Sequence, residues 1–351
     1  MSRAYWSSDA RLAYRRRPAG RMTVALFGVV LALPFPGTAN AQITEYGGAN
    51  GLVPKFADVG GISTRYYEYG EGEPLILLHG GGAGTFNSAN VWTKNISELA
   101  EHFHVFAIDR LGSGMTEAPD DLSRLSYTGD VEFIHDFIQT MDLGRVNLVG
   151  HSAGGAVAYL FGLTHPEALR TLVIVSTGPE VPYLGVRKMD IMAEACQNLE
   201  GDTAWICRIR ALAWLPDVAF DQDYWDSSTF MMSQPVRQDA ERRMAAAPPG
   251  TRPNQRQGSG FWEATWERVQ EDPLDMPVFF ICGRQDPQDW HPPDDPSQIK
   301  RCMTFFGYLG AHADSNVTMT VYNQTGHFPY REHPEKFNGD VISFISHWSG
   351  R

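Results

Sequence analysis

The chain has few of the features that mark binders of nucleic acid, membranes or structural metals. Its 29 Lys and Arg are outnumbered by 41 Asp and Glu, which gives a net charge of −12. This acidic surplus argues against a general partner of nucleic acid or of anionic membranes. No internal repeat is visible, and no apolar stretch after residue 33 is long enough to span a bilayer. The cysteines have neither CxxC nor zinc-site spacing, and they are Cys196, Cys207, Cys282 and Cys302.

The amino-acid composition is that of an ordinary globular protein. Of the 351 residues, 43% are hydrophobic and 12% are aromatic, so disorder as the main state is excluded and a sizeable core can form. The length allows one large domain or two modest ones.

Residues 1–41 have the three parts of a secretory signal peptide. A basic segment comes first, an apolar run over 24–33 follows, and Ala39 and Ala41 stand where a signal peptidase reads small residues. The apolar run is about half of the ~20 residues that a bilayer span needs, which favours cleavage after Ala41 over an uncleaved anchor. We therefore expect a periplasmic or secreted protein, and the export route, Sec or Tat, stays open.

Short apolar runs alternate with helical patterns along most of the chain. Strands are expected at 63–69, 75–78, 104–108, 146–149, 172–175, 278–281 and 317–322, and helices at 92–102, 130–141, 153–163 and 334–347. Strands separated by helix-length segments favour an α/β fold, with a mostly parallel sheet covered by helices on both faces.

The alternation stops between the fifth and sixth of these strands. Residues 178–275 show no strand rhythm and are rich in Trp and Met, so we expect a mostly helical cap inserted into a core made of 42–177 and 276–351. In an oxidising compartment an even cysteine count suggests disulfides, although all four thiols could instead be buried. Cys196 and Cys207 lie close together in the cap and form the favoured pair; a bond between Cys282 and Cys302 is the weaker alternative.

A nucleophile elbow stands between a predicted strand and a predicted helix. Gly150-His-Ser-Ala-Gly154 is a G-x-S-x-G motif, whose tight turn accepts only small residues two places before and after Ser152. A serine needs a base, and His327 follows the last predicted strand at the same edge of the sheet. His151 adjoins Ser152, but neighbours on a sharp turn point apart.

The base in turn needs an acid to fix its tautomer. Asp286 follows the strand at 278–281, and the chain order Ser, Asp, His fits this fold. Glu180, in the loop after the preceding strand, is the main competitor, and Asp289 is a weaker one.

A tetrahedral intermediate also needs backbone donors for its oxyanion. The Ala153 N–H at the helix start is one, and Gly81 in the His79–Gly82 loop is our choice of the second. That loop could otherwise be a phosphate cradle, but the chain lacks the Lys-Ser/Thr of a P-loop and the spacing of a dinucleotide fingerprint. We therefore expect no metal and no organic cofactor.

The stretch 75–348 resembles the α/β-hydrolase superfamily, and within it the meta-cleavage-product hydrolases, which split carbon–carbon bonds of dienoate ring-fission products. The resemblance lies in the motifs at 79–84, 109–114, 150–154, 283–286, 326–327 and 332–333. It implies the α/β-hydrolase fold with a mostly parallel eight-stranded sheet. It also implies that Gly82, Asn90, His151 and Phe328 contact substrate. His151 and Phe328 are departures, because the group often has Asn and usually has Trp at these positions. Arg237 is the candidate for the cap arginine that would bind a dienoate carboxylate.

These observations predict an exported serine hydrolase that acts on a small or medium apolar carboxylic ester or lactone through an acyl-enzyme. The first alternative is a C–C bond hydrolase of the meta-cleavage-product type that uses the same residues. The second is a non-catalytic binding protein on the same scaffold, against which the intact Ser152, Asp286 and His327 argue. The expected partner is a small molecule, and the oligomeric state stays open.

Overall fold

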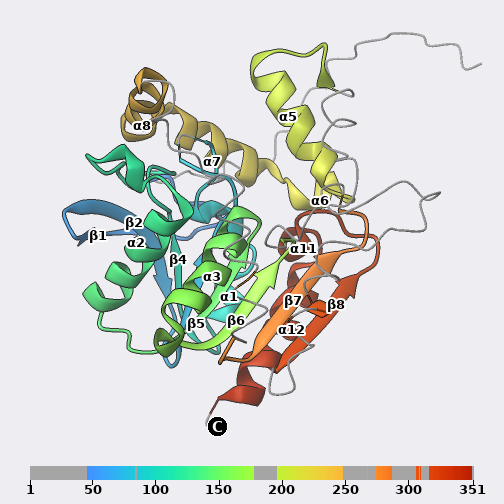
Figure 1. The fold of residues 1–351 in the computed structure, drawn as a ribbon. Coiled ribbons are helices and arrows are strands. Elements are labelled where there is room, and N and C mark those ends of the chain that lie inside the picture. Colours follow the sequence, from blue (N-terminus) through green and yellow to red (C-terminus); the bar gives the residue numbers. More distant parts are fainter. Residues whose placement is uncertain are drawn as a thin grey trace, which may run out of the picture. The chain divides into compact units, whose positions relative to one another are not determined.

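The computed structural model describes residues 46–83, 85–177, 196–247, 274–286 and 316–349, together with residues 267, 306, 307 and 309. The predicted signal peptide, Glu180, Asp289 and Cys302 lie outside these residues. An eight-stranded sheet has the order β1-β2-β4-β3-β5-β6-β7-β8 (Figure 1). The strands are β1 (Lys55–Val59), β2 (Ile62–Tyr69), β3 (Pro74–Leu78), β4 (His104–Ile108), β5 (Val146–His151), β6 (Leu169–Val175), β7 (Val278–Gly283) and β8 (Val317–Tyr322).

Helices follow most of the strands. The described helices are α1 (Ile96–Leu99), α2 (Tyr127–Thr140), α3 (Ala153–Thr164), α5 (Gly201–Leu212), α6 (Pro216–Ala219), α7 (Gln222–Ser233), α8 (Pro235–Ala246), α11 (Pro329–Glu332) and α12 (Pro334–Trp348). Short 3-10 helices are η1 (Ala89–Trp92), η2 (Leu122–Arg124) and η3 (Pro166–Ala168).

The predicted α/β fold is confirmed. Strands β3 to β8 pair in parallel, as βαβ connections require, whereas β1 and β2 form an antiparallel hairpin that joins the sheet through β4. The sequence did not predict β1, because four of its five residues are at least partly exposed and the segment lacks an apolar run.

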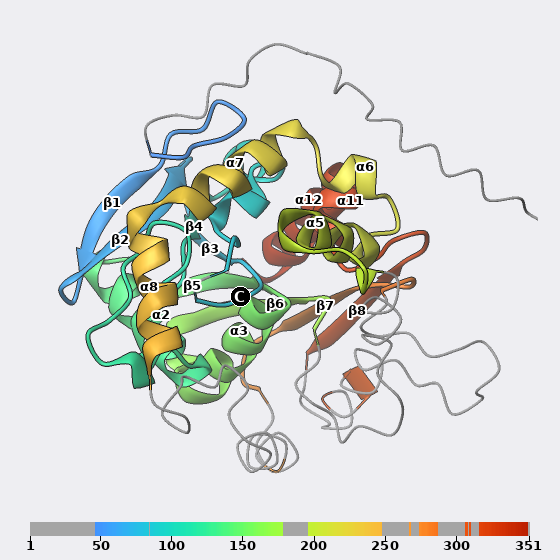
Figure 2. The ribbon, with the colours of Figure 1, turned by 90° about the horizontal axis from the view of Figure 1, so that it is seen from above.

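Side-chain alternation in β3 shows how the sheet buries both faces. Leu75 and Leu77 pack in one cluster with side chains of α1 and α12, whereas Ile76 and Leu78 pack in another with side chains of α2 and α3. Successive strand residues point to opposite faces, so an uninterrupted apolar strand requires helices on both sides. Figure 2 shows the sheet between these two helical layers.

The helix expected over 92–102 is the clearest local error. The chain forms η1 and the four-residue α1 there instead of one continuous helix. The Asn95 side chain donates to the Tyr330 carbonyl at 2.9 Å and to Asn338 Oδ1 at 2.9 Å. Such side-chain bonds to other segments compete with a regular helix surface.

The long connection between β6 and β7 carries helices α5 to α8, as an inserted helical region (Figures 1 and 2). The edges of the predicted cap, 178–195 and most of 248–273, lie outside the described residues. A disulfide joins Cys196 to Cys207, as predicted, and Cys282 is buried in β7. None of the described helices is both long and apolar enough to cross a membrane.

Candidate active site

The elbow has the tight geometry that its glycines predict. Between β5 and α3, Ser152 adopts φ 53° and ψ −121°, a strained conformation for a residue with a side chain. A Cβ on Gly150 would collide with the Gly154 carbonyl, and a Cβ on Gly154 would collide with the His79 carbonyl. The turn therefore needs glycine on both sides, and it presents Ser152 at the start of α3.

Asp286 and His327 are brought together as predicted. Asp286 Oδ2 lies 2.7 Å from His327 Nδ1, and each residue is only 2% exposed. They meet because β7 and β8 are adjacent parallel strands that pair up to Gly283 and Tyr322, and each of the two residues follows the carboxyl end of its strand. The carboxylate holds the proton on Nδ1, which leaves Nε2 as the acceptor.

The elbow and the His327 loop are joined through His151. Its Nε2–H donates to the His327 carbonyl at 2.7 Å, and its Nδ1 accepts from the Tyr330 hydroxyl at 3.2 Å. Burial, and then the nearby His327, hold the pKa of His151 well below its ordinary value. His151 is therefore neutral, with both ring nitrogens bonded to protein.

No hydrogen bond of the described residues joins Ser152 Oγ to His327; the Ser152 backbone N–H donates to the Val175 carbonyl at 3.0 Å. Hydrogen bonds of a catalytic serine are often long without substrate and tighten when it binds.

The glycine loop after β3 packs directly on the elbow. A Cβ on Gly80 would lie 2.9 Å from Ser152 Cβ, and Gly81 has φ 70°, so neither position favours a side chain. In the part of the chain that the structure describes, the N–H groups of Gly81 and Ala153 make no hydrogen bond. Both groups can therefore donate to a bound molecule, and their role as the oxyanion donors stays a prediction.

Arg110 fixes this loop, and sequence reasoning gave it no role. Its Nη1 donates to the His79 carbonyl at 3.2 Å and to the Gly81 carbonyl at 3.0 Å, while Asp130 neutralises its charge through Nε at 3.2 Å. The Arg110 backbone N–H donates to His79 Nε2 at 3.0 Å. Burial, with a smaller contribution from Arg110, lowers the pKa of His79 to about 3. A buried neutral imidazole and a buried ion pair therefore hold the glycine loop in place.

The Asn90 side chain belongs to a buried hydrogen-bond network with β2 and the segment before β1. Its Oδ1 accepts from Arg65 Nη2 at 2.8 Å and from the Tyr67 hydroxyl at 2.7 Å, and its Nδ2 donates to the Gly47 carbonyl at 2.9 Å. Asp109 pairs with the other side of the same guanidinium at 3.2 Å. The structure thus gives Asn90 a bracing contact with the segment before β1.

The remaining residues expected to bind substrate lie around the glycine loop and the His327 loop. Gly82 starts a turn in which its carbonyl accepts from Thr85 Oγ1 at 2.6 Å. Phe328 is buried, with its ring centre 5.2 Å from that of His151 and 5.0 Å from that of Phe220 in the inserted region.

Arg237 lies on α8, where its Nη1 is 3.0 Å from Glu241 Oε2 and 3.4 Å from the Met232 carbonyl. Its charge is thus partly neutralised within the inserted region.

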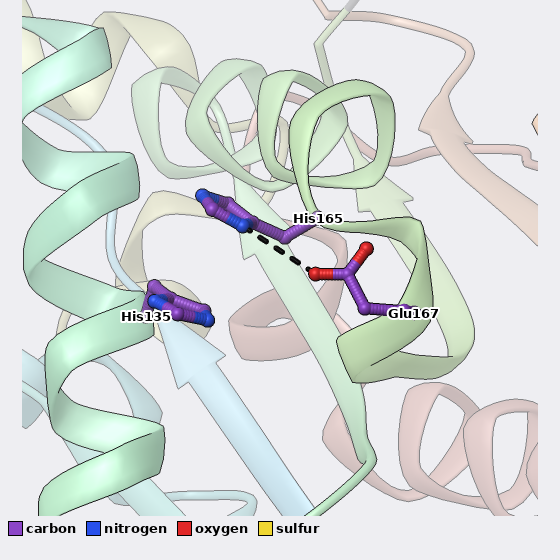
Figure 3. Close-up of side chains that lie close together, drawn as sticks. All are labelled: His135, His165 and Glu167. Atoms are coloured by element: carbon purple, nitrogen blue, oxygen red, sulfur yellow. Dashed lines mark ion pairs between the residues drawn. The ribbon is translucent and has the colours of Figure 1, made fainter.

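A second cluster of possible ligands lies at the far end of α3. His135 of α2, His165 and Glu167 place one donor atom each within 4.8 Å of one another (Figure 3). The two imidazoles are stacked, with ring centres 4.2 Å apart and planes at 12°. Because nitrogen lone pairs lie in the ring planes, stacked rings do not direct them at one point. We therefore assign no metal to this cluster.

Known proteins resemble most of the chain. Residues 73–334 match the family described as alpha/beta hydrolase fold. A 2-hydroxy-6-oxo-6-(2'-aminophenyl)hexa-2,4-dienoic acid hydrolase of Metapseudomonas resinovorans is 42% identical over 139 residues, which are 39% of this chain and about half (46%) of that relative. A 2-hydroxymuconate semialdehyde hydrolase of Pseudomonas sp. strain CF600 is 26% identical over 82% of this chain and 91% of its own length.

The fold is also shared with a solved meta-cleavage product hydrolase of Pseudomonas fluorescens IP01. The TM-score is 0.63 over 84% of this chain and 97% of that one, at 21% identity.

Proposed function

Because the chain belongs to the alpha/beta hydrolase fold family, we propose that Ser152, His327 and Asp286 form the catalytic triad of a serine hydrolase. The observation that carries this proposal is the buried 2.7 Å bond between His327 Nδ1 and Asp286, at the sheet edge where the elbow presents Ser152. The two unbonded N–H groups of Gly81 and Ala153 beside the elbow support it.

The proposed reaction begins with proton transfer from Ser152 Oγ to His327 Nε2 while Oγ bonds to a carbonyl carbon of the substrate. The carbonyl oxygen becomes an oxyanion that Gly81 and Ala153 stabilise by hydrogen bonds. Collapse breaks the bond to the leaving group, which takes the proton from His327. Water, deprotonated by His327, then hydrolyses the acyl-serine, and Asp286 stabilises the imidazolium in both steps.

For the substrate we propose a ketone activated for carbon–carbon cleavage, of the meta-cleavage-product type, rather than the ester that the sequence alone favoured. The support is the set of relatives, since hydrolases named for dienoic acids and for 2-hydroxymuconate semialdehyde align with this chain. In this reaction the leaving group is a carbanion equivalent, so the dienoate must be ketonised before Ser152 attacks. The conjugated ketone then takes up the electron pair of the broken carbon–carbon bond as an enolate, and the protonated His327 supplies the proton that neutralises it.

The test compares kcat/KM for a ring-fission dienoate with kcat/KM for nitrophenyl esters of short acyl chains. The proposal expects the dienoate to be the better substrate, and Ser152→Ala to abolish turnover of both. Dienoate turnover no faster than in buffer, with rapid ester turnover, would reject C–C cleavage and leave the triad intact.

The ester hydrolase remains the second candidate because of one observation. A dienoate carboxylate needs a cation, and Arg237 is already 3.0 Å from Glu241. An uncharged ester needs only an oxyanion hole and an apolar pocket. Loss of dienoate turnover in Arg237→Ala with ester turnover unchanged would assign the carboxylate to Arg237.

We also propose export to an oxidising compartment. The Cys196–Cys207 disulfide supports this location, because such bonds persist outside reducing cytosol. An intact mass of cell-envelope protein that begins at Gln42 would agree with the proposal, and one that begins at Met1 would contradict cleavage.

A further inference from the structure

One buried carboxylate serves as acceptor for two separate segments of the chain. Glu332, at the end of α11, is 2% exposed. Its Oε2 accepts the backbone N–H groups of Trp214 and Leu215, each at 2.9 Å. Its Oε1 accepts those of Gly326 at 2.9 Å and Phe328 at 3.3 Å, and the Gly326 N–H also lies 3.2 Å from Oε2.

The donors identify what this carboxylate connects. Gly326 and Phe328 are the two neighbours of His327, and Trp214 and Leu215 form the turn between α5 and α6 in the inserted region. The N–H of His327 itself donates to the Leu212 carbonyl at 2.8 Å, at the end of α5.

The adjacent Arg331 reinforces the same junction. It is fully buried, and its Nε donates to the Ala219 carbonyl at 2.6 Å while its Nη1 donates to the Val91 carbonyl at 2.8 Å. Its Nη2 lies 3.5 Å from Asp221 Oδ1. The His327 loop is thus held against the turns on either side of α6.

Backbone donors replace water for the buried carboxylate of Glu332, and no described basic side chain forms an ion pair with it. Burial raises its pKa, and the four backbone donors oppose that rise. A neutral amide at this position would have a single acceptor oxygen. Its NH₂ group would face one of the two donor pairs and leave that pair unsatisfied.

We propose that Glu332 is a positioning residue that holds the base His327 in register with Asp286 and couples its loop to the docking of the inserted helical region. This inference rests on the proposed function, because it takes His327 to be the base.

The experiment compares Glu332→Gln with Glu332→Asp and with Glu335→Gln, a matched control at an exposed glutamate three residues further on. The readouts are the rate at which a fluorophosphonate labels Ser152, the melting temperature, and the strongly deshielded NMR resonance of the proton between His327 and Asp286. We expect Glu332→Gln to lose at least tenfold in labelling rate at a temperature where it is fully folded, with that resonance shifted or broadened. Glu332→Asp, which keeps the charge but shortens the reach, should recover part of the rate.

Wild-type labelling rate and an unchanged resonance in folded Glu332→Gln would overturn the inference. Hydrogen exchange of the wild-type protein gives an answer even if that variant fails to fold. The amides of residues 214–215 and of residues 326–328 should be protected to the same degree. Rapid exchange in one of these two segments while the other stays protected would refute the coupling. If wild-type Ser152 does not react at all, the proposed function falls and this inference falls with it.

Discussion

Helix α3 has a group of histidines at each end, and the two groups differ in burial, hydrogen bonding and ring stacking. At its start, His151 and His327 are each 2% exposed, and Asp286, the Tyr330 hydroxyl and a carbonyl fix their nitrogens. At its end, His165 and His135 stack face to face in partly exposed positions, with carboxylates no closer than 3.5 Å to His165.

The comparison shows what distinguishes an organised functional site from a chance cluster of side chains. A buried imidazole whose tautomer is fixed by short bonds can serve as a base or a brace, because its lone pair has a defined direction. For the partly exposed, stacked imidazoles no short bond among the described residues fixes the tautomer, although three potential ligands lie within 4.8 Å. The hydrogen bonds that each ring nitrogen makes are therefore stronger evidence for a functional site than the proximity of residues that could bind a metal.

The largest expected effect is the loss of activity when the buried group at the start of α3 is disrupted. Ser152→Ala and His327→Ala should each lower kcat by about 10⁴-fold or more, and Asp286→Asn should have an effect of similar order, because triad members act as a unit. Fluorophosphonate labelling and steady-state kinetics measure this. Near-full activity of Asp286→Asn together with inactive Glu180→Gln would move the acid to the competing position.

Much of this buried group was predictable from sequence, and the reason is local. The elbow needs glycines at fixed spacing, and Asp286 and His327 follow parallel strands, so their meeting at one edge follows from the sheet alone. The strand 104–108 was predicted with the bounds observed, because an apolar run between polar residues leaves little choice.

What the sequence did not show are contacts between distant segments. Glu332 binds the α5–α6 turn more than a hundred residues away, and Arg110 reaches across to the Gly81 carbonyl. No sequence pattern predicts the partners of either residue. A charged side chain can be predicted to be buried only when the positions of its hydrogen-bond donors or acceptors are known. Both lie in motifs that carried the family resemblance, and that was the available signal.

The second prediction concerns how the buried histidines near the start of α3 make the stability of the protein depend on pH. The pKa of His79 is about 3 in the folded chain against an ordinary 6.5, and that of His151 is also lowered, in both cases mainly by burial. Between pH 6.5 and about 3 the unfolded chain binds a proton at His79 that the folded chain does not. The free energy of unfolding should therefore fall as the pH decreases below 6.5, by about 1.4 kcal/mol per pH unit from His79, and the lowered pKa of His151 acts in the same direction.

Denaturant titrations of the wild type, His79→Gln and His102→Gln between pH 7 and 5 measure this slope. His79→Gln should remove about one proton from it, whereas His102→Gln, at an exposed position, should leave it unchanged. Equal slopes in all three proteins would show that His79 titrates normally in the folded chain.

The third prediction concerns the disulfide that braces α5, whose end contacts the His327 loop. Replacing Cys196 and Cys207 by serine removes a cross-link over 11 residues of sequence, which should cost about 3 kcal/mol in the free energy of unfolding. Calorimetry measures the loss, and reduction of the wild type should reproduce it. The Ser152 labelling rate of the folded variant should fall less than in Glu332→Gln, because the carboxylate acts next to His327; the reverse order would place the main brace in the disulfide.

The smallest effect is expected at the other end of α3. His135→Gln should change the free energy of unfolding by no more than about 0.5 kcal/mol, since it removes one partly exposed ring from a stack without breaking a hydrogen bond to it. Addition of zinc should raise the melting temperature of the wild type no more than that of this variant, because the stacked rings do not converge on one point. A zinc-dependent rise that both His135→Gln and His165→Gln abolish would show that the rings rotate to bind metal. In that event the hydrogen bonds of the ring nitrogens in the metal-free protein would no longer distinguish a functional site from a chance cluster at the two ends of α3.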